Sequence, residues 1–144
     1  MIHSFLLIGQ SNMAGREYID EAINVDVSHI KVLRNGRWQE MFRPINPDRS
    51  FSGVNLAESF AEQYAKKYAV DVGLICCADG GTSLEQWKKG GLLFENAVSQ
   101  AKLAKKHLPL LEFFGIRVRQ IVMRLYILHI KSNLKSLWMI YAMK

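Results

Sequence analysis

Residues 2–15 read IHSFLLIGQSNMAG, an apolar run that stops at a glycine and continues into a polar turn. A short apolar run that ends at Gly9 predicts a buried strand. Ser11 follows directly, between glycines that permit a tight backbone. A serine at such a strand-to-helix turn exposes its hydroxyl at the edge of the sheet, and backbone amides of the same turn can act as oxyanion donors. The alternative is a capped helix start, with Ser11 or Asn12 as the N-cap.

Most of the remaining chain alternates between strand and helix patterns. The apolar spacing predicts strands at 30–34 and 71–78 and helices at 54–68 and 92–106. Residues 42–53 are rich in proline, serine and glycine and predict a loop. This order predicts an α/β domain with a parallel sheet, in which ligands bind at the C-terminal ends of the strands.

A second glycine turn, GGTSLEQW at residues 80–87, follows the predicted strand at 71–78. Together with GQSNMAG at 9–15, it resembles the sialate O-acetylesterase and carbohydrate acetylesterase family of the SGNH hydrolase superfamily, over about residues 1–112. The resemblance implies a three-layer, flavodoxin-like parallel sheet, which we expect to be incomplete at the C-terminus of this chain.

The same resemblance implies a serine esterase that removes O-acetyl groups from carbohydrates such as sialic acid or xylan. It makes Ser11 the nucleophile and its amide the first oxyanion donor. Gly80 or Gly81 is the second donor, and Gln10 and Asn12 support the nucleophile turn. The implied chemistry uses no metal and no organic cofactor.

Two further features of the sequence leave alternatives open. Trp87 and Trp38 either line a sugar site or pack in the core. The glycine turns also suit a non-catalytic module that holds an anion or a sugar through backbone amides.

The catalytic base is missing from the expected place. The family has a third block, W-H-Q-G-E, and a fourth, D-x-x-H, and neither stands where the resemblance requires it; without a base, serine is a weak nucleophile. The string Asp26-Val-Ser-His29 begins only 15 residues after Ser11 and precedes a predicted strand, so a surface pair is favoured. None of the other histidines has a catalytic context: His3, His107 and His129.

The charge of the chain is concentrated in its last 32 residues. Residues 1–112 hold 13 basic and 13 acidic side chains, whereas residues 113–144 hold six basic side chains and no acid, which accounts for the net charge of +6. Six bases scattered through an apolar stretch make a poor nucleic-acid footprint, and the stretch has no clean apolar face for a membrane surface. We therefore expect neither partner, and we interpret residues 113–144 as an aberrant tail translated out of frame.

Composition excludes several other classes. Adjacent Cys76 and Cys77 suit neither a disulfide framework nor a zinc site. The sequence contains no run of 18 apolar residues, so no membrane-spanning helix is predicted. The N-terminus lacks the features of a signal peptide, and we therefore expect a cytoplasmic location. An incomplete sheet would expose apolar surface and an open edge, which predicts self-association.

The out-of-frame hypothesis makes a direct prediction about the gene. Residues 114–122 permit codons that, shifted by two bases, translate as W-H-Q-G-E-A-D-S, the missing third block. We expect the DNA across codons 104–125 to contain this block in the shifted frame and to continue to a D-x-x-H. A shifted frame without the block would mean that the tail is encoded as it stands and would favour the binding module.

Overall fold

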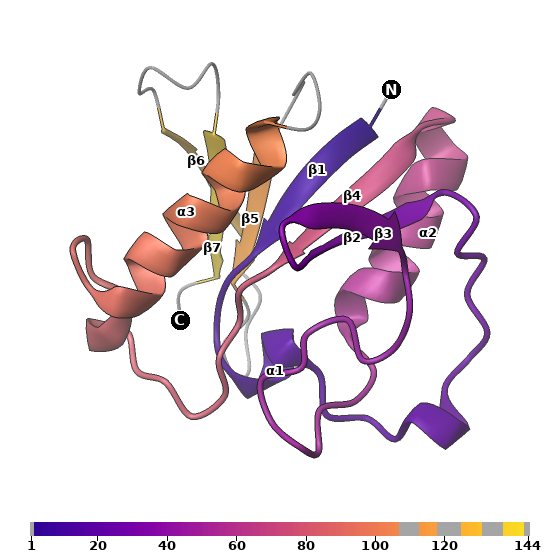
Figure 1. The fold of residues 1–144 in the computed structure, drawn as a ribbon, viewed down its shortest axis with the longest axis horizontal. Helices are drawn as coiled ribbons and strands as arrows, with labels where there is room; N and C mark the ends of the chain where they lie inside the picture. The colour runs from indigo at the N-terminus through magenta and orange to yellow at the C-terminus, as the bar shows by residue number, and fades with distance from the viewer. Residues whose placement is uncertain (1, 107–112, 118–124, 131–136, 143–144) are drawn as a thin grey trace.

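The computed structural model describes residues 2–106, 113–117, 125–130 and 137–142, and places the first strand in the middle of a mostly parallel sheet (Figure 1). The elements, in chain order, are β1 (Ile2–Leu7), α1 (Ser11–Ala14), η1 (Ile19–Glu21), β2 (Ile30–Arg34), β3 (Arg37–Glu40), α2 (Leu56–Tyr68), β4 (Asp71–Cys76), η2 (Glu85–Trp87), α3 (Leu92–Lys106), β5 (Phe113–Arg117), β6 (Leu125–Ile130) and β7 (Leu137–Ala142). The strands and helices predicted between residues 2 and 106 are confirmed.

The order of the strands in the sheet is β3-β2-β4-β1-β5-β7-β6. Strands β2, β4, β1, β5 and β7 are parallel, and β3 and β6 pair antiparallel at the two edges. After β1 the chain forms β2, β3 and β4 on one side of that strand and then β5 on the other side. Such a reversal of strand order is where open α/β sheets bind ligands, at the C-terminal ends of the strands.

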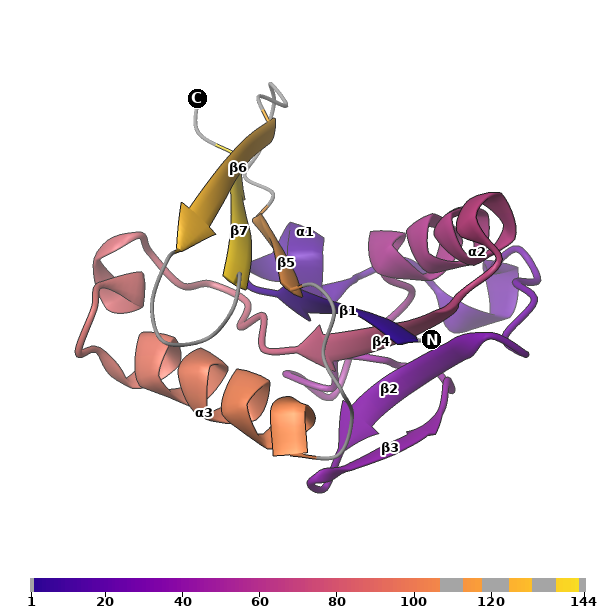
Figure 2. The same ribbon diagram turned by 90° about the horizontal axis from the view of Figure 1, so that it is seen from above.

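Alternating side chains of β1 give the sheet its two covered faces. Phe5 and Leu7 pack in the cluster that includes α2, whereas Leu6 and Ile8 pack in the cluster that includes α3. Figure 2 shows α2 and α3 on opposite sides of the sheet. Both helices turn alanines at helical spacing toward the strands: Ala57, Ala61 and Ala65 in α2, and Ala97, Ala101 and Ala104 in α3. The predicted three-layer α/β fold is confirmed.

The start of α2 is fixed by a capping box, which holds the loop before it in place. The Asn55 side chain accepts from the Ala57 amide at 2.8 Å, and Glu58 accepts from the Asn55 amide at 3.2 Å. Glu58 is 1% exposed and also pairs with Arg43 at 2.7 Å, so its buried charge is compensated. Loop 41–55 is therefore anchored at both ends.

The sheet continues beyond residue 112. The sequence had instead predicted a sheet that is incomplete at the C-terminus. Strand β5 pairs with β1, and β7 and β6 extend the sheet beyond it. Short runs rich in β-branched and aromatic residues suit strands, and the edge of β1 offers unpaired backbone groups to such a run. The out-of-frame origin of the tail stays a prediction.

We predict that Gly73 on β4 does not tolerate a side chain. A Cβ atom there would lie 2.7 Å from the Trp38 ring and 3.0 Å from the Ser4 hydroxyl. Overpacking of this kind costs about 1–3 kcal/mol, so Gly73→Ala should lower the free energy of unfolding in urea by that amount. Because Trp38 is the obstacle, the double variant with Trp38→Leu should lose less than the sum of the two single changes. Additive losses would contradict this explanation.

Candidate active site

Ser11 lies at the C-terminal end of β1, as the first residue of the short helix α1. The capped-start alternative is wrong: the N-cap position is Gln10, and no side chain caps the helix. The Gln10 carbonyl accepts from the amides of Met13 and Ala14 at 2.9 and 3.0 Å. Within the described residues, the amides of Ser11 and Asn12 have no acceptor and the half-buried Ser11 hydroxyl has no partner, so these groups are available to a ligand.

The second glycine turn lies directly beside the Ser11 turn. Parallel pairing of β1 and β4 continues past both strands, because the Cys77 amide donates to the Leu7 carbonyl and the Asp79 amide to the Gly9 carbonyl, both at 2.9 Å. The two blocks that the sequence singled out begin 71 positions apart, at Gly9 and Gly80, and are thereby brought together at the C-terminal ends of the strands.

The hydrogen bonds of the second turn distinguish its two glycines. The Gly80 amide donates to Asp48 Oδ2 at 2.8 Å, whereas the Gly81 amide has no acceptor among the described residues. A Cβ atom on Gly80 would collide with Arg16 and Asp48, and Gly81 has φ of +79°, which only glycine adopts readily. Of the two predicted donors, Gly81 is the one whose amide is uncommitted.

Asp48 ties three loops together and was missed by the sequence analysis. Besides the Gly80 amide, its carboxylate accepts from Arg16 at 2.6 and 3.0 Å and from the Ser52 hydroxyl at 2.9 Å. Its side chain is 5% exposed. Burial raises the pKa of this carboxyl, but the hydrogen bonds from Arg16, Gly80 and Ser52 outweigh it and lower the pKa from 3.8 to about 2.

Two asparagines of the same loop were also missed. Asn46, which is buried, exchanges two hydrogen bonds with the backbone of Ala78, at 2.9 and 3.1 Å. Asn55 donates to the Met13 carbonyl in the nucleophile turn. The pattern Asn55-x-x-Glu58 is the available sequence signal, because it matches a capping box, but the contact with Met13 joins residues 42 positions apart.

The predicted supporting residues differ in what they contact. Gln10 supports the turn through its backbone carbonyl, and the Asn12 side chain is exposed. Trp87 is 8% exposed, packs in the cluster that includes α3, and donates from Nε1 to the Thr82 hydroxyl at 3.0 Å. Thr82 in turn donates to the Asp79 carbonyl at 2.7 Å. These contacts favour the packing alternative for Trp87, which braces the second glycine turn.

The structure describes the side chains of two histidines, His3 and His29. Both lie at the N-terminal ends of the parallel strands, whereas Ser11 lies beyond the C-terminal end of β1. His3, near the start of β1, bonds to the Tyr64 hydroxyl at 2.9 Å. His29, just before β2, is 65% exposed at its side chain and pairs with Asp71 at 2.8 Å, while Asp26 accepts from Ser28. The six residues of β1, which rise about 3.3 Å each, separate these N-terminal ends from Ser11.

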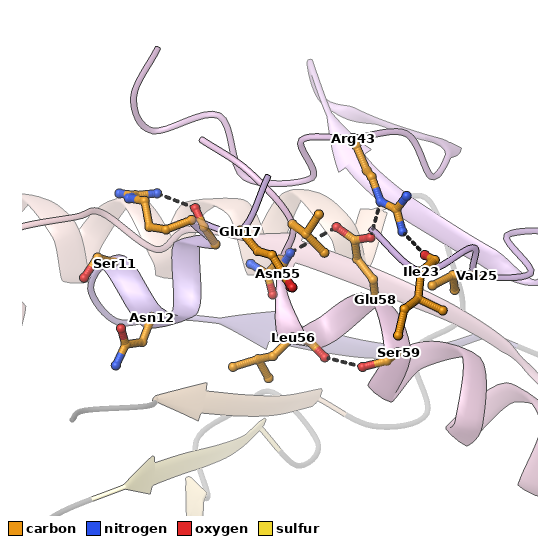
Figure 3. Close-up of a pocket in the computed structure, with 13 residues that line it drawn as sticks. Ser11, Asn12, Glu17, Ile23, Val25, Arg43, Asn55, Leu56, Glu58 and Ser59 are labelled. Carbon is orange, nitrogen blue, oxygen red and sulfur yellow. Dashed lines mark hydrogen bonds and ion pairs between the residues drawn. The ribbon is translucent and has the colours of Figure 1, made fainter. Parts of the chain in front are cut away.

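A cavity of about 380 Å³ adjoins the nucleophile turn on the side of α2 (Figure 3). The Arg43–Glu58 pair and Asn55 line one part of it, and Ser11 and Asn12 lie at its other end. In Figure 3 the side chains of Ser11 and Asn12 point away from the Arg43–Glu58 pair. The cavity therefore borders the Ser11 turn, with Ser11 and Asn12 among the residues that line it.

Cysteine thiols and groups of metal-ligating side chains are the other features of the described residues that bear on chemistry. Burial raises the pKa of the Cys76 thiol above its usual range and that of Cys77 to about 12, so neither is a thiolate at neutral pH. No group of three or more metal-ligating side chains occurs among these residues. Within the same residues, no helix is long and apolar enough to cross a membrane.

Comparisons with known proteins show what the chain is similar to. A family model described as "Carbohydrate esterase, sialic acid-specific acetylesterase" matches residues 1–119. A probable carbohydrate esterase of Arabidopsis thaliana is 28% identical over 123 residues, which are 71% of this chain and 47% of that protein. The X-ray structure of an Arabidopsis thaliana protein superposes with a TM-score of 0.67 at 26% identity, covering 78% of this chain and 56% of the other. The chain thus spans about half the length of the curated relative.

We predict that Asp48 makes the fold sensitive to acid. Because its pKa is lowered from 3.8 to about 2, it stabilises the folded state above about pH 4, and this stabilisation, about 2 kcal/mol, is lost as the pH falls to about 2. Asp48→Asn should remove this part of the pH dependence of the free energy of unfolding. The control Asp20→Asn, at an exposed position, should leave it unchanged. Equal pH dependence in all three proteins would contradict the assignment.

Proposed function

The chain belongs to the sialic acid-specific acetylesterase family of carbohydrate esterases, and from that premise we propose that it acts on the O-acetyl esters of carbohydrates through Ser11. The observation that carries the proposal is that, among the described residues, the Ser11 hydroxyl and the amides of Ser11, Asn12 and Gly81 have no partner, at the C-terminal ends of the strands. Sialic acid and xylan are the substrates that the resemblance suggests.

In the proposed reaction, Ser11 Oγ attacks the acetyl carbonyl carbon and loses its proton to a base. The amides of Ser11 and Gly81 donate hydrogen bonds to the oxyanion that forms on the carbonyl oxygen. The ester C–O bond then breaks, and the sugar hydroxyl leaves with a proton. Water attacks the acetyl-enzyme in the same way and releases acetate, which restores the serine.

The proposed reaction requires a base that accepts the proton of Ser11. Neither of the two histidines whose side chains the structure describes, His3 and His29, lies at the C-terminal ends of the strands, where Ser11 is found. A serine without a base to accept its proton reacts slowly, although oxyanion donors and binding alone still give some acceleration. We therefore propose that this chain by itself hydrolyses acetyl esters at close to the background rate.

A serine-directed fluorophosphonate tests the nucleophile without requiring turnover. We expect it to label the unmodified chain at Ser11 slowly, and Ser11→Ala to abolish the labelling. The control is Ser50→Ala, which removes an exposed hydroxyl in loop 41–55 and should change nothing. Release of acetate from an acetylated sugar should stay near the buffer rate in all three proteins.

Other outcomes separate the alternatives. A robust rate of acetate release that disappears in Ser11→Ala would contradict the proposed inactivity and confirm the esterase. Absence of labelling, together with protection against unfolding by inorganic phosphate, would favour the module that binds anions or sugars through its backbone amides.

A further inference from the structure

Arg49 contacts the second glycine turn, although it lies outside both motif blocks. Its Nη2 donates to the Gly80 carbonyl at 2.7 Å and lies 2.9 Å from Asp79 Oδ1. Its Nη1 donates to the Asp48 carbonyl at 2.7 Å. The Gly80 carbonyl and the Asp79 carboxylate thus hold the guanidinium against the turn, even though the side chain is 42% exposed.

The bond to the Gly80 carbonyl also determines where the next amide points. The carbonyl of Gly80 and the N–H of Gly81 belong to one peptide unit, and in a planar trans peptide they point in opposite directions. With the carbonyl held toward Arg49, the Gly81 N–H is held on the side away from Arg49. Asp48 fixes the preceding peptide by accepting from the Gly80 N–H at 2.8 Å.

A peptide between two glycines needs such a restraint. Glycine tolerates both signs of φ, so rotation of the whole peptide plane meets little steric resistance. Apart from Gly81 itself and its two chain neighbours, no described residue has an atom within 4 Å of the position that a Gly81 Cβ would take. If the plane turned over, the Gly80 carbonyl would replace the Gly81 N–H, and a carbonyl oxygen repels an oxyanion.

We propose that Arg49 is a positioning residue, which holds the Gly80–Gly81 peptide so that the Gly81 N–H faces the oxyanion. The proposal rests on the esterase function proposed above. Asp48 and Arg49 act on the two sides of Gly80, one on its amide and the other on its carbonyl. Arg49 does not touch the reacting atoms and acts through the orientation of one peptide.

The orientation of the amide is tested directly by NMR. Arg49→Met removes the donors, Arg49→Lys keeps one, and Arg37→Met, at an exposed position on β3, removes the same charge elsewhere. The residual dipolar coupling of the Gly81 N–H reports the direction of this bond. We expect it to change in Arg49→Met, to recover in Arg49→Lys, and to stay unchanged in Arg37→Met. An unchanged coupling in Arg49→Met would overturn the proposal.

The second measurement is the rate at which a neutral fluorophosphonate labels Ser11. In that step the Ser11 Oγ–P bond forms, the P–F bond breaks, fluoride leaves and the serine proton passes to solvent. The phosphoryl oxygen then occupies the place of the oxyanion. Loss of one oxyanion donor typically costs 10²–10³ in rate, so we expect labelling of Arg49→Met to be slower by about tenfold or more than labelling of Arg37→Met. Arg49→Lys should recover most of the rate.

The two measurements keep the proposals apart. Equal labelling rates in Arg49→Met and Arg37→Met would overturn the role of Arg49 while leaving Ser11 as the nucleophile. If Ser11 is not labelled in the unmodified chain, the proposed function fails, and the dipolar coupling alone then decides whether Arg49 orients the peptide. Unchanged amide spectra away from the turn show that the variants are folded.

Discussion

The parallel pairing of β1 with β4 is the constraint on which the candidate site depends. It continues beyond the strands through the bonds from Cys77 to Leu7 and from Asp79 to Gly9. Parallel strands end at the same edge, so the turns that follow them must meet. Ser11 and the second glycine turn therefore lie side by side as a consequence of backbone pairing, before any side chain contributes.

The side chains of loop 41–55 hold the two turns in place. Its Asn46, Asp48, Arg49 and Asn55 side chains bond to backbone groups of the two turns. Buried backbone groups without partners are costly, and the loop supplies partners to carbonyls and amides that neither helix nor sheet satisfies. It leaves the amides of Ser11, Asn12 and Gly81 without acceptors among the described residues. Side chains of this loop thus decide which amide of the second glycine turn stays open, whereas the Ser11 and Asn12 amides are open because they begin a helix.

The proposed reaction also needs a base near Ser11. The Ser11 hydroxyl and the open amides lie at the C-terminal ends of the strands, while His3 and His29 are engaged with Tyr64 and Asp71 at the N-terminal ends. The described residues therefore offer candidates for the nucleophile and the oxyanion donors of the proposed reaction, whereas a histidine base for it would have to come from outside the residues whose side chains the structure describes.

The sequence by itself determined the α/β layering, the strands and helices up to residue 106, and the two glycine turns, because these depend on local periodicity and on turn chemistry. It pointed to Ser11 through a motif, but it left Gly80 and Gly81 equivalent and gave no sign of Asp48 or Arg49. Those two residues lie about 30 positions from the glycines, and nothing in local spacing connects them. It also predicted that the sheet would stop short, whereas strands from the tail pair with β1 and beyond. Only the tertiary structure decided which amides are open and which are taken, because a hydrogen bond between distant loops depends on where the fold places both partners.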